Sequence, residues 1–265
     1  RAGYARNAFG TSPEAPVEAW DRRWPSDMCG AFADGSVQGR AGFGLAAVAI
    51  KGLGMAGQIK AFIRPRPQEQ ETCANLKDEV IGNEFSGQRA LVVGGSRGLG
   101  EATAKLLALG GAEVAITYYQ GSDDAHRVAT EIISADGKVE SFCLNVLDEN
   151  LGLVEKLTPN WKPTHLYYFA TPFIALGTRG EFSPELFEKF CNYYVTGFQR
   201  IVRQLSHFAL EGVFFPSSIF VQELQPGMDE YADAKEAGET SCSSLALEFP
   251  NTVFQKPRLT KMATD

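Results

Sequence analysis

Leu91-Val-Val-Gly94-Gly95-Ser96-Arg97-Gly98-Leu99-Gly100 is the stretch that decides the fold of this chain, and Glu101-Ala-Thr-Ala-Lys-Leu-Leu107 follows it directly. An apolar strand enters a glycine-rich turn, and a helix rich in alanine and leucine leaves it. Glycine is needed where the backbone takes a positive φ or approaches a ligand without a Cβ in the way. The start of the helix offers free N–H groups and the positive end of its dipole to a phosphate. The turn therefore predicts a nucleotide-binding βαβ unit, the alternative being an ordinary tight turn.

Short apolar runs and longer helical stretches alternate from Gln88 onward. This alternation predicts a mostly parallel sheet with helices on both faces, which binds ligands at the carboxyl ends of its strands. We therefore expect an α/β fold with a doubly wound parallel sheet of the Rossmann type. The expected strands are Ala90–Val93, Glu113–Tyr118, Val139–Cys143, Thr164–Ala170, Gly212–Ser217 and Thr252–Pro257, and the expected helices include Gly98–Ala108 and Pro184–Ala209.

The first part of the chain has a different composition, with Gly/Ala-rich and aromatic stretches. Within it, Gly57–Arg64 places its apolar residues on one face, which predicts a strand. The proline- and charge-rich stretch Pro65–Glu71 follows, and it is typical of a linker between domains. We therefore expect an amino-terminal extension or partial domain at residues 1–84 and the nucleotide-binding domain at residues 85–265.

Composition excludes several classes of protein. The 265 residues carry a formal charge of −7, which argues against a general affinity for nucleic acid or an anionic membrane. The best apolar run, Ala41–Ile50, is well short of the roughly 20 residues that a membrane span needs. Five dispersed cysteines without a CxxC pair favour a reduced cytoplasmic protein over a disulfide framework, and neither they nor the three histidines suggest a metal site.

A second cluster holds the candidate catalytic groups. An expected strand runs into Ser217-Ser218, and Tyr231 and Lys235 follow four residues apart, on one face of an expected helix. An ammonium beside a phenol favours the phenolate, so we expect Lys235 to lower the pKa of Tyr231 from its usual value near 10. Such a phenol can donate a proton to a developing alkoxide, and the serine can hydrogen-bond the same oxygen. Taken alone, a Tyr-x-x-x-Lys pair also occurs by chance on many exposed helices.

Together, the turn Gly94-x-x-x-Gly98-x-Gly100, the serine and the Tyr-x-x-x-Lys pair resemble the short-chain dehydrogenase/reductase family, over about residues 88–265. The resemblance implies that Tyr231 is the general acid in reduction, that Lys235 holds the nicotinamide ribose and tunes Tyr231, and that Ser218 orients the substrate carbonyl. In the family the serine precedes the tyrosine by a little over a dozen residues, and 231 − 218 = 13 favours Ser218 over Ser217. The hydride comes from the cofactor. The family's dimers and tetramers imply a homo-oligomer.

The resemblance implies NADP (NADPH) as the cofactor, in preference to NAD. Arg97 matches the basic residue that many NADP-dependent members use against the 2′-phosphate, the alternative being a solvated arginine. The second strand is followed by no immediate carboxylate for a free ribose hydroxyl, because Asp123 and Asp124 lie farther on, where we expect them to cap a helix. A guanidinium without a competing carboxylate favours the extra phosphate. The implied cofactor-binding residues are Gly94, Ser96, Arg97, Gly98, Leu99, Gly100, Asn145, Ala170 and Lys235.

The chain departs from the family pattern at several places. Tyr194 stands where a tetrad asparagine is usual, with Asn192 two residues out of register, so the proton relay is expected to differ. The usual Asn-Asn-Ala-Gly is replaced by Phe169-Ala-Thr-Pro172, and Asn145 replaces an aspartate. The chain does not begin with methionine and stops at Asp265. We therefore expect a piece of a longer protein, or a truncated and inactive one, whose sheet lacks its last strand.

The expected function is NADP-dependent reduction of a small-molecule ketone. Residues 20–64 faintly resemble the later half of a MaoC-like hot-dog domain, the alternative being an irregular packing extension. If that resemblance holds, the substrate is an acyl thioester and the enzyme is a 3-oxoacyl reductase, by analogy only. The alternative functions are a catalytically silent nucleotide-binding or interaction domain, and an epimerase or dehydratase of the same family that recycles its nucleotide.

Overall fold

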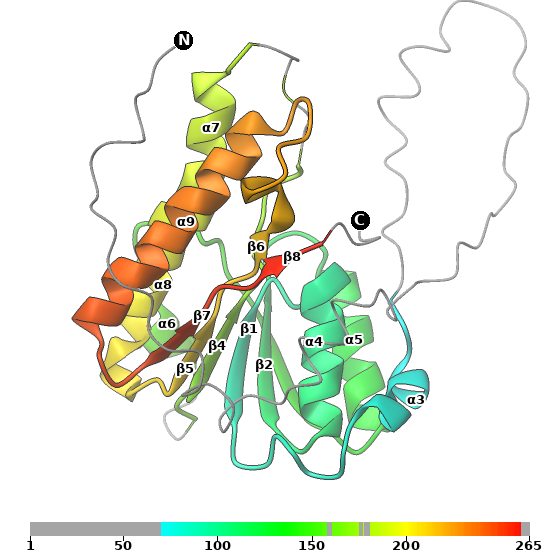
Figure 1. Cartoon of the computed structure of the whole chain (residues 1–265). Helices are drawn as coiled ribbons and strands as arrows, with labels where there is room; N and C mark the ends of the chain where they lie inside the picture. Colours follow the sequence, from blue (N-terminus) through cyan, green and yellow to red (C-terminus); the bar gives the residue numbers. More distant parts are fainter. Residues whose placement is uncertain (1–69, 158–160, 175–176, 178–180, 261–265) are drawn as a thin grey trace, which may run out of the picture.

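The computed structural model describes residues 70–157, 161–174, 177 and 181–260 (Figure 1). Its strands are β1 (Arg89–Val93), β2 (Glu113–Tyr118), β3 (Lys138–Cys143), β4 (His165–Tyr168), β5 (Gly212–Phe214), β6 (Ser217–Ser218), β7 (Val253–Gln255) and β8 (Arg258–Leu259). Its α-helices are α3 (Cys73–Leu76), α4 (Gly98–Leu109), α5 (Ser122–Ser134), α6 (Leu153–Lys156), α7 (Pro184–Cys191), α8 (Phe198–Leu205) and α9 (Asp229–Glu248). The expected strand at Gly57–Arg64 and the hot-dog resemblance lie outside the described residues.

The central sheet has six strands in the order β3-β2-β1-β4-β5-β7, and every neighbouring pair is parallel. The order reverses between β1 and β4, because the chain fills one side of β1 first and then crosses to the other. Parallel neighbours place the carboxyl ends of all strands at one edge of the sheet. The expectation of a doubly wound parallel sheet is confirmed.

Helices cover both faces of this sheet, with α4 and α5 on one side and α7, α8 and α9 on the other (Figure 1). Strand β1 shows why its sequence is apolar throughout. Ala90 and Val92 are buried in the core under α4, whereas Leu91 and Val93 are buried in the core under α7 to α9. A strand with helices on both faces has no solvent-exposed side and therefore needs no polar alternation.

Two expected elements are subdivided in the structure. The helix expected at Pro184–Ala209 consists of α7, a π-helical turn at Asn192–Gly197, α8 and a 3-10 turn at Ser206–Phe208. The strand expected at Gly212–Ser217 ends at Phe214, and Ser217 begins β6, which pairs with β8 instead. Pro216 lies at the break because it has no N–H to continue the ladder.

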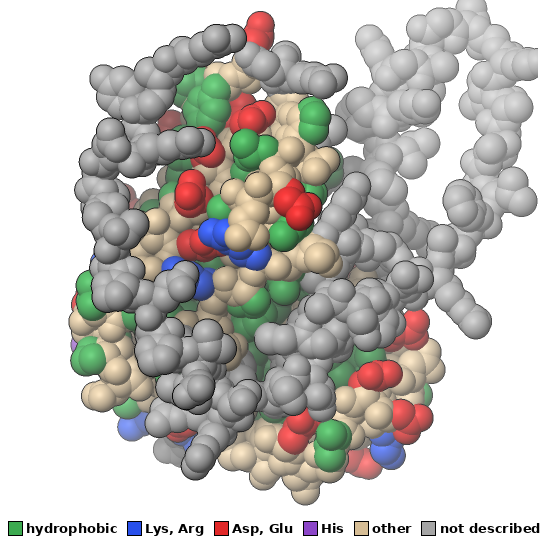
Figure 2. Space-filling model, in the orientation of Figure 1, with side chains coloured by type: hydrophobic (Ala, Val, Ile, Leu, Met, Phe, Trp, Pro, Cys, Tyr) green, Lys and Arg blue, Asp and Glu red, His purple; other side chains and the backbone are tan. Residues whose placement is uncertain are grey.

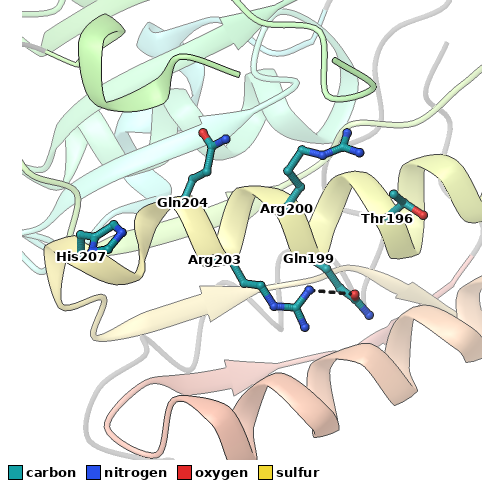
Figure 3. Close-up of a pocket in the computed structure, with 6 residues that line it drawn as sticks. All are labelled: Thr196, Gln199, Arg200, Arg203, Gln204 and His207. Atoms are coloured by element: carbon teal, nitrogen blue, oxygen red, sulfur yellow. Dashed lines mark hydrogen bonds between the residues drawn. The ribbon is translucent and has the colours of Figure 1, made fainter. Parts of the chain in front are cut away.

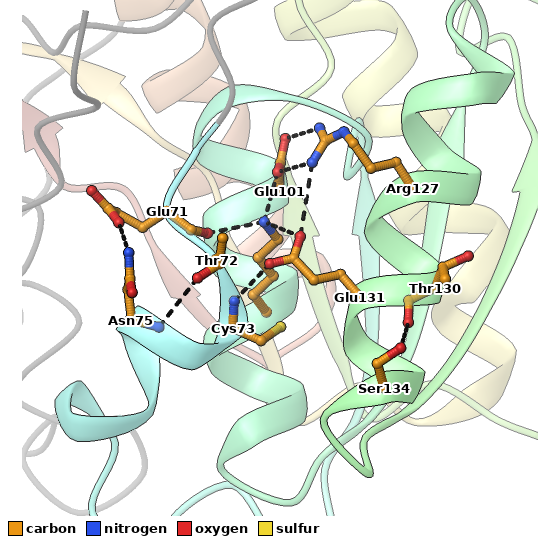
Figure 4. Close-up of polar contacts among 10 residues, drawn as sticks. Glu71, Thr72, Cys73, Asn75, Glu101, Arg127, Thr130, Glu131 and Ser134 are labelled. Carbon is orange, nitrogen blue, oxygen red and sulfur yellow. Dashed lines mark hydrogen bonds and ion pairs between the residues drawn. The ribbon is translucent and has the colours of Figure 1, made fainter. Parts of the chain in front are cut away.

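Residues 70–85 pack against the nucleotide-binding domain. Cys73, Leu76 and Phe85 are buried, and Cys73 and Phe85 join the core beside α4. A polar cluster also ties this segment to α4 and α5: Lys105 bonds the Glu71 carbonyl, and Glu131 accepts from the Cys73 N–H (Figure 4). Because these contacts begin at Glu71, we propose that the domain boundary lies before this segment and not at residue 84.

Charged side chains on the face in Figure 2 are interspersed, with the cationic ones in the middle close to acidic ones. That mixture makes no broad basic surface on this face. No helix within the described ranges is both long and apolar enough to cross a bilayer.

Candidate active site

At two positions of the glycine turn after β1, Gly94 and Gly100, the surrounding backbone leaves no room for a Cβ. Gly94 has a φ of +82°, and a Cβ there would lie 3.0 Å from the backbone of Phe169 and Ala170 after β4. At Gly100, in the first turn of α4, a Cβ would lie 2.1 Å from the Gly94 carbonyl oxygen, which no side chain can satisfy. The turn is therefore folded so tightly that only hydrogen atoms fit between its backbone segments.

The start of α4 is suited to a phosphate. Arg97 is the N-cap residue in extended conformation, and no side chain caps the first-turn N–H groups. The residues that follow, Gly98, Leu99 and Gly100, place their amides at the positive end of a helix of 12 residues. Gly98 and Gly100 contribute no side chain in front of those amides. This cradle fits the diphosphate of a dinucleotide.

Arg97 differs from the sequence expectation, because a carboxylate does compete for it. Its Nε donates to Asp124 Oδ2 at 2.6 Å, with both side chains partly exposed. A Cβ at Gly121 would lie 2.6 Å from Arg97 Nη2, so the guanidinium lies across the segment that follows β2. The expected cap is also wrong: Gly121 is the N-cap of α5, and Asp123 and Asp124 lie in its first turn. A 2′-phosphate bound at Arg97 would therefore interact with a guanidinium that is also paired with Asp124.

The remaining residues that the resemblance assigns to the cofactor lie at the same edge of the sheet. Ser96 is buried within the turn, and Leu99 is half-buried. Ala170 follows β4 and faces Gly94. Asn145 follows β3, but its side chain makes local hydrogen bonds, donating to Asp148 Oδ1 at 2.7 Å and accepting from the Leu147 N–H at 3.1 Å. An adenine contact by Asn145 would have to replace one of these.

Ser218 and Tyr231 come together at the amino-terminal end of α9. Ser218 ends β6, is buried, and its Oγ accepts from the Phe220 N–H at 3.2 Å. Tyr231 lies in the first turn of α9, close enough to Ser218 for that serine to lower the pKa of the phenol. The neighbouring Ser217 is directed elsewhere, because its Oγ donates to Glu239 Oε1 at 2.5 Å. The structure therefore separates the two serines, and it brings Ser218 to the tyrosine.

Lys235 lies one helical turn beyond Tyr231, and its side chain is directed into the protein. The residue is 6% exposed, and Nζ donates to the Pro216 carbonyl at 2.7 Å. Nζ also lies 4.0 Å from the centroid of the Tyr194 ring. Burial lowers the pKa of Lys235 to about 7, against the opposing effects of Cys242 and Glu239. The ammonium form of Lys235 is therefore less favoured here than in water.

The pKa of Tyr231 is raised, not lowered as expected. Burial raises this pKa, and Ser218 opposes the rise without cancelling it. Nζ of Lys235 lies 5.9 Å from the Tyr231 ring centroid. Tyr231 is therefore a neutral phenol at physiological pH. A neutral phenol still has the proton that a general acid must supply.

A short chain of contacts joins the glycine turn to the candidate catalytic cluster, which is formed by Ser218, Tyr231 and Lys235. Gly94 lies against Ala170, and the next residue, Thr171, shares a hydrogen bond of 2.6 Å with the Tyr194 hydroxyl. The Tyr194 ring in turn contacts Lys235 and lies edge-on to Tyr231 at 5.8 Å between centroids. All these groups lie at the carboxyl edge of the sheet, which is where parallel α/β sheets bind ligands.

The sequence analysis does not identify the contacts of two residues of the site, Tyr194 and Glu239. Tyr194 was recognised as a replacement for an asparagine, but its contact with Lys235 was not expected. Glu239, one turn after Lys235, binds Ser217 and makes a bidentate ion pair with Arg258, with both distances 2.7 Å. An acidic residue on the buried face of a helix was the available signal for Glu239, because buried carboxylates need partners.

A separate surface depression of about 480 Å³ lies along α8 and the turns that flank it. Figure 3 shows that its lining side chains project from one helical face, and none of them belongs to the catalytic cluster. They are Thr196, Gln199, Arg200, Arg203, Gln204 and His207. We do not assign the nucleotide to this depression, because the glycine turn does not border it.

Known sequences resemble this chain in the same region. The family model described as short chain dehydrogenase matches residues 88–253, which is more than half of the chain. The uncharacterized oxidoreductase YgfF of Escherichia coli is 48% identical over 61 residues, and a 3-oxoacyl-[acyl-carrier-protein] reductase of Synechocystis is 44% identical over 62 residues. Each match covers 23% of this chain and 25% of the relative, so the chain matches about a quarter of the length of these curated relatives.

A solved structure with the same architecture is the landomycin C-6 ketoreductase LanV with bound NADP and rabelomycin. It is 25% identical with a TM-score of 0.59, and the match covers 66% of this chain and 76% of that one. The parallel sheet, the glycine turn and the matched family model agree with one another. The chain belongs to the short-chain dehydrogenase family.

Proposed function

We propose that this chain is an NADPH-dependent carbonyl reductase. The observation that carries the proposal is the proximity of Ser218 and Tyr231, with Lys235 one turn behind them, at the sheet edge that also holds the glycine turn. Oxidoreductase relatives and NADP-bound ketoreductases of similar fold support it.

The residues of the chain have separate tasks in this reaction. The glycine turn and the start of α4 hold the diphosphate, and Arg97 binds a 2′-phosphate. NADPH, when bound, supplies a hydride to the carbonyl carbon. Tyr231 transfers its phenolic proton to the carbonyl oxygen and becomes a phenolate, so a ketone becomes an alcohol. Ser218 donates a hydrogen bond to the same oxygen and fixes its position.

The raised pKa of Tyr231 is consistent with this direction of reaction. Burial keeps the phenol protonated before the substrate binds. When the phenolate forms, the ammonium form of Lys235 stabilises it, because this interaction grows with negative charge on the oxygen. The proton is therefore retained until an alkoxide develops.

For the substrate we propose a ketone, with a 3-oxoacyl thioester as the form to test first. The support for the thioester is the similarity of one segment to the Synechocystis reductase, which extends over 62 residues. A thioester and a simple cyclic ketone differ in size and polarity, so a small substrate panel separates them.

The test compares Tyr231→Phe with the wild-type chain in NADPH oxidation, with cyclic ketones and a 3-oxoacyl thioester as substrates. We expect loss of the proton donor to lower the rate by about 100-fold or more, as is usual for general acids, while the Kd for NADPH stays within about twofold of wild type. Tyr167→Phe is the matched control, because the Tyr167 hydroxyl bonds Gln88, which precedes β1 at the opposite edge. Undiminished turnover in Tyr231→Phe would remove Tyr231 from the mechanism. Wild-type NADPH binding without turnover of any substrate would favour a silent nucleotide-binding domain.

A further inference from the structure

The buried ammonium of Lys235 lies among aromatic rings. Its Nζ is 4.0 Å from the centroid of Tyr194, 4.9 Å from that of Phe215 and 5.9 Å from that of Tyr231. Its hydrogen bond goes to the Pro216 carbonyl. A cation within about 6 Å of a ring face is attracted by the negative charge above that face, and the attraction is larger where water is excluded. Tyr194 is the nearest of the three rings and therefore contributes most.

Tyr194 is itself held firmly in this position. It lies in the π-helical turn, is fully buried, and stacks on Phe190 with an angle of 4° between the rings. Its hydroxyl is bonded to Thr171 Oγ1, in the segment directly after β4. A Cβ at Gly238 on α9 would lie 2.4 Å from the Phe215 ring and 3.1 Å from the Tyr194 carbonyl oxygen, so glycine lets both pack against α9. Ring and hydroxyl are thus fixed by contacts from three separate elements.

We propose that Tyr194 is a positioning residue for Lys235: the face of its buried ring holds the ammonium in place beside Tyr231. The role of Lys235 in supporting Tyr231 rests on the proposed function. The contact between Tyr194 and Lys235 does not, and it can be tested without a substrate.

The groups that face Lys235 determine how its charge responds to pH. Tyr231, Glu239 and Cys242 approach from α9 itself, and Tyr194 approaches from the π-helical turn. The end of β5 contributes only the Phe215 ring and the Pro216 carbonyl. Glu239 is already occupied by Arg258 and Ser217. Beside the Pro216 carbonyl, the Tyr194 ring is thus a close contact that favours the ammonium and is not committed to another cation.

The substrate-independent test is NMR of the full chain labelled with 13C at the ε position of lysine, with the Lys235 signal assigned from Lys235→Met. Tyr194→Phe keeps the ring, so Lys235 should titrate as in wild type. Incorporation of 3,4,5-trifluorophenylalanine at position 194 keeps the ring shape but removes the negative charge from its face. We expect Lys235 then to lose its proton at lower pH. Phe85→Leu, which loses a buried ring from the core on the other face of the sheet, should leave the titration unchanged.

A second arm measures the pH profile of ketone reduction for the same proteins. With the fluorinated ring, activity at pH 8 should fall about tenfold relative to Tyr194→Phe, as expected from loss of a desolvated cation–π contact, and activity at pH 6 should fall less. Equal Lys235 titration in the fluorinated and phenylalanine proteins would overturn the proposal, whatever the activity. A shifted titration in a protein without reductase activity would support the proposal and refute the proposed function instead.

Discussion

The sharpest stability prediction concerns the buried ion cluster between α4, α5 and residues 71–73. Lys105 is fully buried, and its Nζ lies 2.8 Å from Glu101 Oε1, 2.7 Å from Glu131 Oε2 and 2.9 Å from the Glu71 carbonyl. Arg127 closes the cluster with two bonds of 2.8 Å to Glu101 (Figure 4). All three protons of the ammonium thus have acceptors.

Lys105→Met keeps most of the side-chain volume and removes the charge. Removing one partner of a buried ion pair costs about 3–5 kcal/mol, because the other charge is left without compensation. Here Arg127 still neutralises Glu101, so we expect the low end, about 3 kcal/mol, which corresponds to a fall in Tm of roughly 6–12 °C for a domain of this size. Chemical denaturation followed by circular dichroism of the full chain measures this loss.

Two further variants test the cost that is assigned to the unpaired buried charge. Lys138→Met removes a lysine whose pair with Glu113 is exposed, so it should change the free energy of unfolding by less than about 0.5 kcal/mol. The double variant Glu131→Gln with Lys105→Met should be more stable than Lys105→Met alone, because Glu131 is the carboxylate that the single variant leaves without a close cation, and glutamine keeps an acceptor for the Cys73 N–H. A Lys105→Met protein as stable as Lys138→Met, or a double variant weaker than the single, would refute the cost assigned to the unpaired charge.

Two further predictions concern ionic contacts at the site. Arg97→Ala should raise the Kd for NADPH about 10- to 100-fold, which corresponds to the loss of a charged hydrogen bond. The Kd for NADH should change little. Equal losses of affinity for the two nucleotides, measured by nucleotide fluorescence, would contradict the 2′-phosphate role. The hydrogen bonds from Arg258 and Ser217 lower the pKa of Glu239 despite its burial. Its charge therefore stabilises the fold above the ordinary glutamate pKa, and this contribution is lost as pH falls through the lowered value. Glu239→Gln should cost about 2 kcal/mol at pH 7 and progressively less below about pH 4, and a pH-independent cost in denaturation experiments would refute this.

Much of the fold is determined by local sequence. The stretch from Leu91 to Leu107 predicts strand, turn and helix from short-range requirements alone: apolar residues for a strand buried on both faces, and glycines where a Cβ would meet backbone. Because the strands alternate with helices along the chain, a parallel sheet is then the favoured arrangement. The Ser218, Tyr231 and Lys235 pattern also points to one edge of the sheet before any coordinates are known. Their proximity follows from that topology.

The charge states and partners at the site are decided by the tertiary structure. Asp124 reaches Arg97 from 27 residues away, and Arg258 reaches Glu239 across 19 residues. The pKa of Tyr231 rises because the phenol is buried, and burial is a property of the packed core that helical spacing cannot give. The Tyr194 ring contacts Lys235 only because α7, the π-helical turn and α9 pack together. Periodicity reports which face of an element is buried, whereas the identity of the group across the contact depends on how distant elements pack.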